Sequence, residues 1–237
     1  MQLAEWDSNF FKKRIFVINI DVENHAPKLA SLLDDLRDQK ADGAYIFLSQ
    51  PSMSWSKIFE DGKISMVDEK LIFEKRLSTV SKSAANYSAI ERFSEGIKED
   101  LIGLSIEAGK YSRFKTDGEL AYKFEELYKI WIEKSVDGLL ADRVYVYRDS
   151  GLVKGMITCK LTDKVGTIGL IAVSPYIQGK GIGKALIETA EEYFISNEAS
   201  VTRVATQKNN FPACRFYTNA GYEIVSDQPV YHVWFKN

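Results

Sequence analysis

The chain has 237 residues, of which 45% are hydrophobic, and it is long enough for one large globular domain or two smaller ones. Its 31 basic and 33 acidic side chains give a formal net charge of −2, which offers no general attraction for nucleic acid. No apolar run approaches the length of a membrane span and no secretory signal is seen, so we expect a cytoplasmic protein that does not contact membranes. Two cysteines without C-x-x-C spacing and two histidines predict neither a disulfide framework nor a metal site.

The first third of the chain alternates between strand and helix patterns. Ile and Val alternate over Arg14–Asp21, which predicts a strand, and the leucines of residues 27–39 recur at helical spacing. This order is typical of a small α/β unit. The sequence then predicts a strand, a short helix and two further strands, over Ala44–Ser49, Trp55–Phe59, Lys63–Val67 and Lys70–Leu77.

A polar stretch without apolar periodicity separates this part from the rest. Residues 78–87 are rich in Ser, Ala and Asn and are the best candidate for a linker. We therefore expect an N-terminal α/β domain in residues 1–85 and a second domain in residues 86–237. The second domain should contain two helices and three antiparallel strands, over Glu99–Ala108, Leu120–Ser135, Arg143–Arg148, Leu152–Leu161 and Val165–Val173, with a polar loop over Lys110–Asp117.

A glycine-rich hexapeptide, Q-G-K-G-I-G, occupies Gln178–Gly183. It follows an apolar segment that predicts a strand, Gly169–Val173, and it opens an amphipathic segment that predicts a helix, Ile182–Phe194. This arrangement binds phosphate, because glycines let the backbone approach an anion and the first N–H groups of the helix point at it. After the helix we expect a strand, a helix and two strands, over Ser200–Thr206, Pro212–Asn219, Tyr222–Val225 and Val230–Phe235.

Single residues exclude two common phosphate-binding motifs. A P-loop needs Ser or Thr where this chain has Ala185, and a dinucleotide-binding fingerprint needs Gly where it has Lys184. The hexapeptide instead resembles the acyl-CoA pyrophosphate loop Q/R-x-x-G-x-G/A of the GNAT N-acetyltransferases, with Gln178, Gly181 and Gly183 at its fixed positions. The alternative is a glycine turn that only caps a helix.

A second block, N-x-x-A-x-x-x-Y-x-x-x-G-Y, begins at Asn210 and is similar to a later motif of the same superfamily. In a helix that starts at Pro212, the side chains of Asn210, Cys214 and Tyr217 lie on one face. The resemblance implies that Asn210 hydrogen-bonds the pantetheine arm and that Tyr217 is the general acid that protonates the departing thiolate. From the residues alone, Asn210 could equally be a helix cap, Tyr217 a core aromatic and Cys214 a packing residue.

The two motifs and the order of elements together imply the GNAT fold, a mixed-sheet α/β architecture, with acetyl-CoA as co-substrate and no metal. The family's strand before the loop splays from its neighbour and frees N–H groups for the thioester and pantetheine. By this resemblance we expect eleven coenzyme-binding residues: Ile171, Ala172, Val173, Gln178, Gly179, Lys180, Gly181, Ile182, Gly183, Lys184 and Asn210.

The general base of the reaction has no candidate on the expected strand. Residues 167–173 contain neither an acid nor a histidine. Either a distant carboxylate acts through water, or the acceptor amine has a low pKa and needs little help. An amine flanked by hydroxyls, as in an amino sugar, satisfies the second option.

A wider resemblance supports an amino sugar as acceptor. The segments W-D-S-x-F-F from Trp6, Y-S-R-F from Tyr111 and R-V-A-T-Q from Arg203 resemble the dTDP-fucosamine acetyltransferase family. That family acetylates the amine of a dTDP-linked amino-dideoxyhexose for surface polysaccharide. By analogy Arg113 binds the diphosphate or the sugar, although it could be a solvated loop residue, and a homodimer is compatible with the family.

Three functional hypotheses follow from these patterns. The first is an acetyl-CoA-dependent N-acetyltransferase for a dTDP-linked amino sugar. The second is an acetyltransferase for a peptide, lysine or polyamine amine, which the two motifs alone allow. The third is an acyl-CoA-binding sensor without catalysis, and an intact Tyr217 argues against it.

Overall fold

The computed structural model describes residues 1–21, 29–52, 64–78, 89–94 and 98–235. The chain divides into two compact units. Unit 1 comprises Met1–Leu71, Gln207–Phe211 and Val225–Asn237, and unit 2 comprises Ile72–Thr206 and Pro212–Ile224.

Unit 1 is a small α/β unit. Its strands lie in the order β1-β2-β3-β10-β4, where β2 and β3 are parallel and β3 and β10 are antiparallel. The helix α2 connects the two parallel strands, as such a crossover requires. Its elements are β1 (Gln2–Leu3), α1 (Glu5–Phe11), β2 (Ile15–Ile20), α2 (Leu29–Asp38), β3 (Gly43–Leu48) and parts of β4 (Ile64–Arg76) and β10 (Glu223–Trp234).

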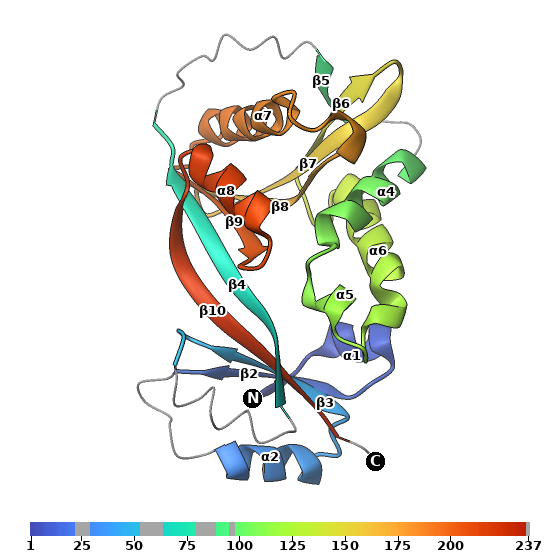
Figure 1. The fold of residues 1–237 in the computed structure, drawn as a ribbon, viewed down its shortest axis with the longest axis vertical. Coiled ribbons are helices and arrows are strands. Elements are labelled where there is room, and N and C mark those ends of the chain that lie inside the picture. The colour runs from blue at the N-terminus through green and yellow to red at the C-terminus, as the bar shows by residue number, and fades with distance from the viewer. Residues whose placement is uncertain (22–28, 53–63, 79–88, 95–97, 236–237) are drawn as a thin grey trace. The chain divides into compact units, whose positions relative to one another are not determined.

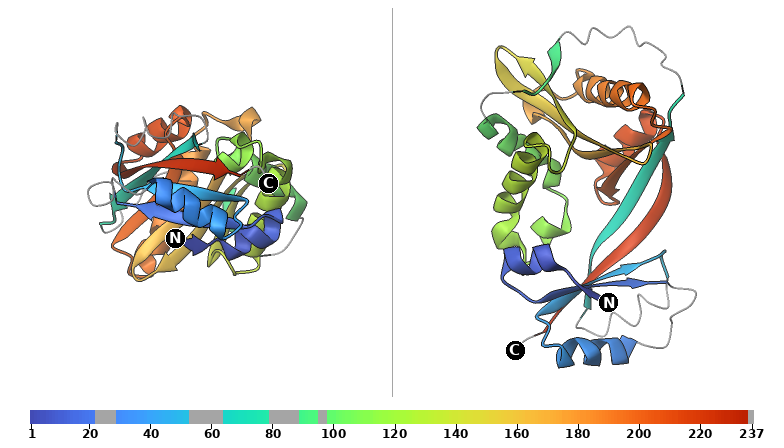
Figure 2. Two further views of the ribbon diagram at one scale, coloured as in Figure 1. Left: turned by 90° about the horizontal axis from the view of Figure 1, so that it is seen from below. Right: turned by 180° about the vertical axis from the view of Figure 1, so that it is seen from behind.

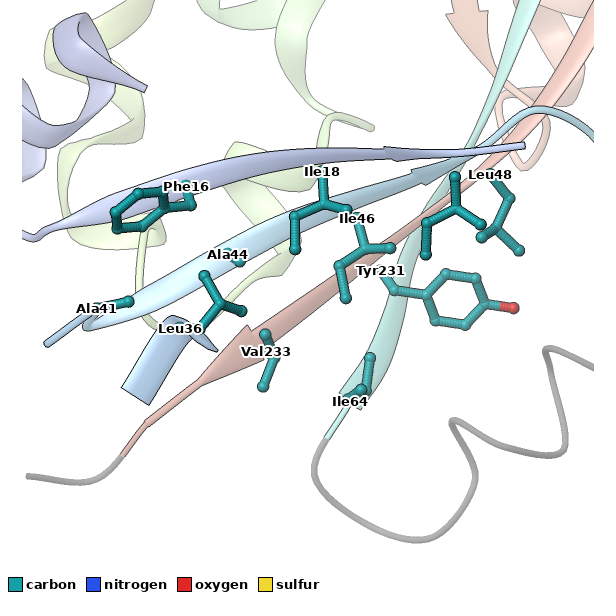
Figure 3. Packing of buried hydrophobic residues seen from close by; sticks show 11 residues of the cluster. Phe16, Ile18, Leu36, Ala41, Ala44, Ile46, Leu48, Ile64, Tyr231 and Val233 are labelled. Carbon is teal, nitrogen blue, oxygen red and sulfur yellow. The ribbon is translucent and has the colours of Figure 1, made fainter. Parts of the chain in front are cut away.

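The core of unit 1 lies on one face of this sheet. Side chains of β2, β3 and β10 point toward Leu36 of α2, as Figure 3 shows. Ile18, Ile46 and Val233 are buried in this cluster, each in a different strand. The alternating apolar residues of β2 and the leucines of α2 therefore meet in the packing that their periodicities predict.

Unit 2 contains the larger part of the sheet. Its strands lie in the order β4-β9-β8-β7-β6-β5; β6, β7 and β8 form an antiparallel meander, and β9 runs parallel to β8. The helix α7 packs on β6, β7 and β8, whereas α4 packs on β7 and β8 from the other face (Figures 1 and 2). The helical elements are α4 (Lys98–Gly109), α5 (Arg113–Thr116), η2 (Ala121–Lys123), α6 (Phe124–Val136), η3 (Pro175–Ile177), α7 (Ile182–Ser196) and α8 (Phe211–Asn219), and the strands are β5 (Ile90–Arg92), β6 (Arg143–Asp149), β7 (Leu152–Thr162), β8 (Val165–Val173) and β9 (Val201–Gln207).

In two places the sequence predicts a pair of strands and the structure has one continuous strand. The predicted strands within residues 63–77 are one strand, β4, and those within residues 222–235 are one strand, β10. Both predictions divided the strand at polar residues in its middle. Both strands continue through these residues in the structure, where the Nζ of Lys208 lies 3.0 Å from carboxylate oxygens of Glu69 and Asp227.

Other differences are smaller. The predicted loop over residues 110–117 contains the short helix α5, and the predicted helix over residues 120–135 begins as the 3₁₀ turn η2. The predicted helix at residues 55–59 and nearly all of the predicted linker lie outside the described residues. The two units also differ from the predicted domains 1–85 and 86–237, because residues 207–211 and 225–237 return to unit 1. Among the described residues, no helix is long and apolar enough to cross a membrane.

Candidate functional site

The glycine loop leads from β8 to α7, as predicted. Gly179 and Gly181 both have φ of +79°, a conformation that side chains rarely adopt, yet an added Cβ at either position would meet nothing within 4 Å. At Gly183 the reason is space, since a Cβ there would lie 3.3 Å from ring carbons of Phe216 in α8. The loop therefore needs glycine at two positions for backbone conformation and at a third for close packing.

The first turn of α7 is suited to bind an anion. Gly181 is the N-cap residue, and no acidic side chain lies in the first turn. The N–H groups of Ile182, Gly183 and Lys184 have no acceptor within the helix, because the first intrahelical bond is donated by Ala185 to the Gly181 carbonyl at 3.0 Å. The positive end of the helix dipole adds to this preference for negative charge.

Charged and polar side chains border the same turn. Lys180 and Lys184 are exposed, and the Nζ of Lys184 lies 3.8 Å from a carboxylate oxygen of Glu188. The Nε2 of Gln178 donates a hydrogen bond to the Val173 carbonyl at 2.9 Å. Gln178 thus ties the loop back to the end of β8, a contact that the motif comparison did not predict.

The strands β8 and β9 diverge where the sequence predicted a splay. Their paired register runs from Val165↔Val201 to Ile168↔Val204, although β8 continues to Val173. On the other edge, Ser174 donates its N–H to the Lys154 carbonyl at 2.8 Å. Consecutive N–H groups of a strand point to opposite edges.

This alternation separates the three predicted strand residues. The N–H of Ala172 points toward β7, like that of Ser174, and Ala172 is paired with Met156. Ile171 and Val173 point their N–H groups to the edge where β9 has diverged. These two residues therefore have N–H groups at the edge that β9 has left, whereas the N–H of Ala172 belongs to the sheet.

Tyr217 lies in α8 within an aromatic cluster. It is 4% exposed, and its ring centroid is 5.4 Å from those of Phe73 and Phe216 and 6.1 Å from that of Tyr222. Burial, with a smaller effect of nearby Cys214, raises the pKa of the Tyr217 hydroxyl well above its ordinary value. The phenol therefore keeps its proton at neutral pH, as a general acid must.

The loop and the tyrosine helix are in contact. Phe216, the neighbour of Tyr217, packs against Gly183 at the start of α7. The two sequence motifs are thus brought together in unit 2 through a residue that belongs to neither pattern. No signal in the sequence marks Phe216, because its role depends on the packing of α7 and α8.

The structure leaves the predicted roles of Asn210 and Arg113 as predictions. Asn210 is half-buried in the turn before α8, donates its N–H to the Gln207 carbonyl at 2.9 Å, and belongs to unit 1. Arg113 begins α5, and its guanidinium lies 4.3 Å from the ring centroid of Phe114. Cys214 is half-buried and burial raises the pKa of its thiol, which fits the packing alternative.

Arg203, the first residue of the R-V-A-T-Q segment, forms an ion pair. The Nε of Arg203 in β9 lies 2.7 Å from a carboxylate oxygen of Glu74 in β4. This ion pair crosses between strands of unit 2 at a partly exposed position.

Among the residues that the structure describes, no group of three His, Cys, Asp or Glu side chains could hold a metal ion.

Relatives with a curated function share sequence with this chain. The dTDP-fucosamine acetyltransferase of Escherichia coli O6:H1 is 29% identical over 125 residues, which are 52% of this chain and 53% of the relative. The spore coat polysaccharide biosynthesis protein SpsD of Bacillus subtilis is 22% identical over 241 residues, with 97% of this chain and 81% of the relative covered. The chain spans only part of other curated relatives, with 36% of the length of one and 23% of another covered.

The fold and a family model agree with these relatives. The crystal structure of a GCN5-related N-acetyltransferase from Sphaerobacter thermophilus superposes with a TM-score of 0.58 at 15% identity, covering 93% of this chain and 74% of that one. Residues 110–222 match the model of the acetyltransferase (GNAT) family, and this range contains both the glycine loop and Tyr217. Residues 110–222 are therefore similar to the acetyltransferases of the GNAT family, and the chain has the α/β fold of that crystal structure.

Proposed function

We propose that the protein transfers the acetyl group of acetyl-CoA to the amine of a dTDP-linked amino-dideoxyhexose. The observation that supports the coenzyme assignment is the presence of three groups of donors in unit 2, where the start of α7 contacts α8 at Gly183 and Phe216. These are the N–H groups of Ile171 and Val173, the first turn of α7, and the buried Tyr217 hydroxyl. They suit the thioester and pantetheine, the pyrophosphate and the departing sulfur, respectively.

The reaction needs no covalent enzyme intermediate. The neutral amine attacks the thioester carbonyl, so that a carbon–nitrogen bond forms and the carbon–sulfur bond breaks. Tyr217 gives its proton to the thiolate, and the nitrogen loses one proton to solvent, which restores the tyrosine through exchange. We assign the polarisation of the acetyl carbonyl and the binding of the pantetheine to the N–H groups of Ile171 and Val173.

The choice of acceptor rests on two further observations. Strand β8 carries no acid or histidine, which favours an amine that is already neutral near pH 7. Two relatives carry names that concern nucleotide sugars or polysaccharide, a dTDP-fucosamine acetyltransferase and a spore coat polysaccharide biosynthesis protein. We assign Arg113 to the acceptor's diphosphate or sugar on the strength of the Y-S-R-F segment.

An acceptor panel tests this proposal. The protein is incubated with acetyl-CoA and, in separate reactions, with dTDP-amino sugars, amine-terminated peptides, lysine and polyamines, while the free thiol of coenzyme A is measured. We expect thiol release with dTDP-amino sugars. Turnover confined to peptides or polyamines would assign a different acceptor, and coenzyme binding without turnover on any acceptor would favour an acyl-CoA sensor.

A further inference from the structure

In one part of the β7–β8 pairing, β8 has one residue more than the facing segment of β7. Ile157 is paired with Ile171 and Cys159 with Ile168, so the single residue Thr158 stands opposite both Gly169 and Leu170. Two residues opposite one define a β-bulge, which bends its strand and disrupts the ladder locally.

The Thr158 side chain satisfies the backbone at this bulge. Its Oγ1 accepts the N–H of Leu170 at 2.8 Å, and the residue is 1% exposed. A Cβ at Gly169 would lie 2.9 Å from the same oxygen, so glycine at this position leaves room for the hydroxyl. A buried backbone N–H without an acceptor is costly, and the threonine hydroxyl removes that cost.

The bulge lies where β8 leaves β9. Pairing between the two strands ends at Ile168↔Val204, one residue before Gly169. The extra residue also reverses the side of the sheet that later residues of β8 face. Ile168 and Ile171 are three positions apart and would lie on opposite faces of a regular strand, but they are paired with Cys159 and Ile157, which share one face. Beyond the bulge, the N–H groups of Ile171 and Val173 point to the open edge.

We propose that Thr158 is a positioning residue for acetyl-CoA. Its hydroxyl holds Leu170, and thereby the bulge, in the geometry that turns the Ile171 and Val173 N–H groups toward the coenzyme. Thr158 acts through β8 and does not touch the coenzyme itself. This inference rests on the proposed use of acetyl-CoA by this site.

Two substitutions separate the hydroxyl from the volume of the side chain. Thr158→Val keeps the shape and removes the acceptor, and we expect the dissociation constant of coenzyme A and the KM for acetyl-CoA to rise about tenfold, or ~1.4 kcal/mol. The KM for the acceptor amine should not change. Thr158→Ser keeps the oxygen and should restore wild-type affinity for the coenzyme.

A matched control lies in the neighbouring strand. Thr202 of β9 is fully buried, and its hydroxyl interacts with the Tyr222 side chain and not with the Leu170 amide, which is bound by Thr158. Thr202→Val should therefore leave coenzyme affinity unchanged, and the melting temperatures of all variants report whether they fold. If the wild-type protein does not bind coenzyme A, the proposed function itself is overturned. If the wild-type protein binds coenzyme A and the folded Thr158→Val variant binds it equally well, only the role of Thr158 is overturned.

Amide exchange of the wild-type protein provides a test that does not depend on variant folding. Without coenzyme, the Leu170 amide should exchange slowly, and those of Ile171 and Val173 should exchange faster. Addition of coenzyme A should slow Ile171 and Val173 and leave Leu170 unchanged. Equal, fast exchange of all three amides without coenzyme would contradict the proposal, as would a Thr158→Ser variant that binds as weakly as Thr158→Val.

Discussion

The two halves of the site use different chemical groups. In the proposed coenzyme site, the half formed by β8, the glycine loop and α7 offers backbone N–H groups, whereas the half formed by α8 offers one side chain, Tyr217. Binding by backbone N–H groups survives most side-chain substitutions but requires the right backbone conformation. Catalysis by a side-chain hydroxyl is lost when the substitution removes that hydroxyl. Substitutions in the first half should therefore weaken coenzyme binding, and substitution of Tyr217 should slow the chemical step.

Loss of the Tyr217 hydroxyl should have the largest effect. Tyr217→Phe keeps the ring in the cluster with Phe73 and removes the proton donor, so kcat should fall by about 10²- to 10³-fold. The dissociation constant of coenzyme A, measured by calorimetry, should stay at the wild-type value. Tyr222→Phe is the matched control, because Tyr222 is also buried, with its ring centroid 6.1 Å from that of Tyr217. Equal losses in the two variants would assign the effect to packing.

Alanine at Gly181 should weaken coenzyme binding without a specific effect on the chemical step. The position has φ of +79°, and a left-handed conformation costs a non-glycine residue about 1–2 kcal/mol. Binding of coenzyme A should weaken by about tenfold as the loop relaxes. Gly103→Ala in α4 is the control, since nothing lies within 4 Å of the added methyl group and alanine favours a helix by up to about 1 kcal/mol. Unchanged coenzyme affinity in Gly181→Ala would remove the loop from the binding half.

Alanine at Gly183 should have a smaller effect that reaches both halves. The added methyl group would lie 3.3 Å from the Phe216 ring, so Phe216 must shift by a few tenths of an ångström and carry its neighbour Tyr217 with it. We expect a modest loss of both coenzyme affinity and kcat. A second substitution, Phe216→Leu, should recover part of the loss in kcat. Simple addition of the two single-variant effects would argue against coupling of the halves.

The pH profile should show no alkaline loss near the ordinary pKa of tyrosine. Burial raises the pKa of Tyr217, and because a general acid acts in its protonated form, the active range extends upward. With a dTDP-amino sugar, kcat/KM should rise as the acceptor amine loses its proton and then stay level to at least about pH 10. A fall in kcat/KM below that pH would show that Tyr217 titrates in its ordinary range.

The predictable parts of the molecule are those with local signals. The meander, the glycine loop and α7 follow from apolar periodicity and from glycines at fixed spacing, and the structure contains them. The continuity of β4 and β10 was not predicted, because the polar residues in the middle of each strand resemble turns in the sequence. In the site, the glycines and Tyr217 were expected from sequence motifs. The Phe216 contact and the bulge at Thr158 depend on contacts between elements, which no local pattern encodes. The Gln178–Val173 hydrogen bond is local, and it depends on the path of the loop between these two residues.

Identification of the reaction product tests the central claim most directly. The protein is supplied with acetyl-CoA and a dTDP-linked amino-dideoxyhexose, and the nucleotide sugar and the free thiol are quantified together by mass spectrometry and thiol titration. Our account predicts one N-acetylated nucleotide sugar for each thiol released, and at most about 1% as much product from Tyr217→Phe in the same time. Thiol release without an acetylated sugar, or full activity of Tyr217→Phe, would contradict it.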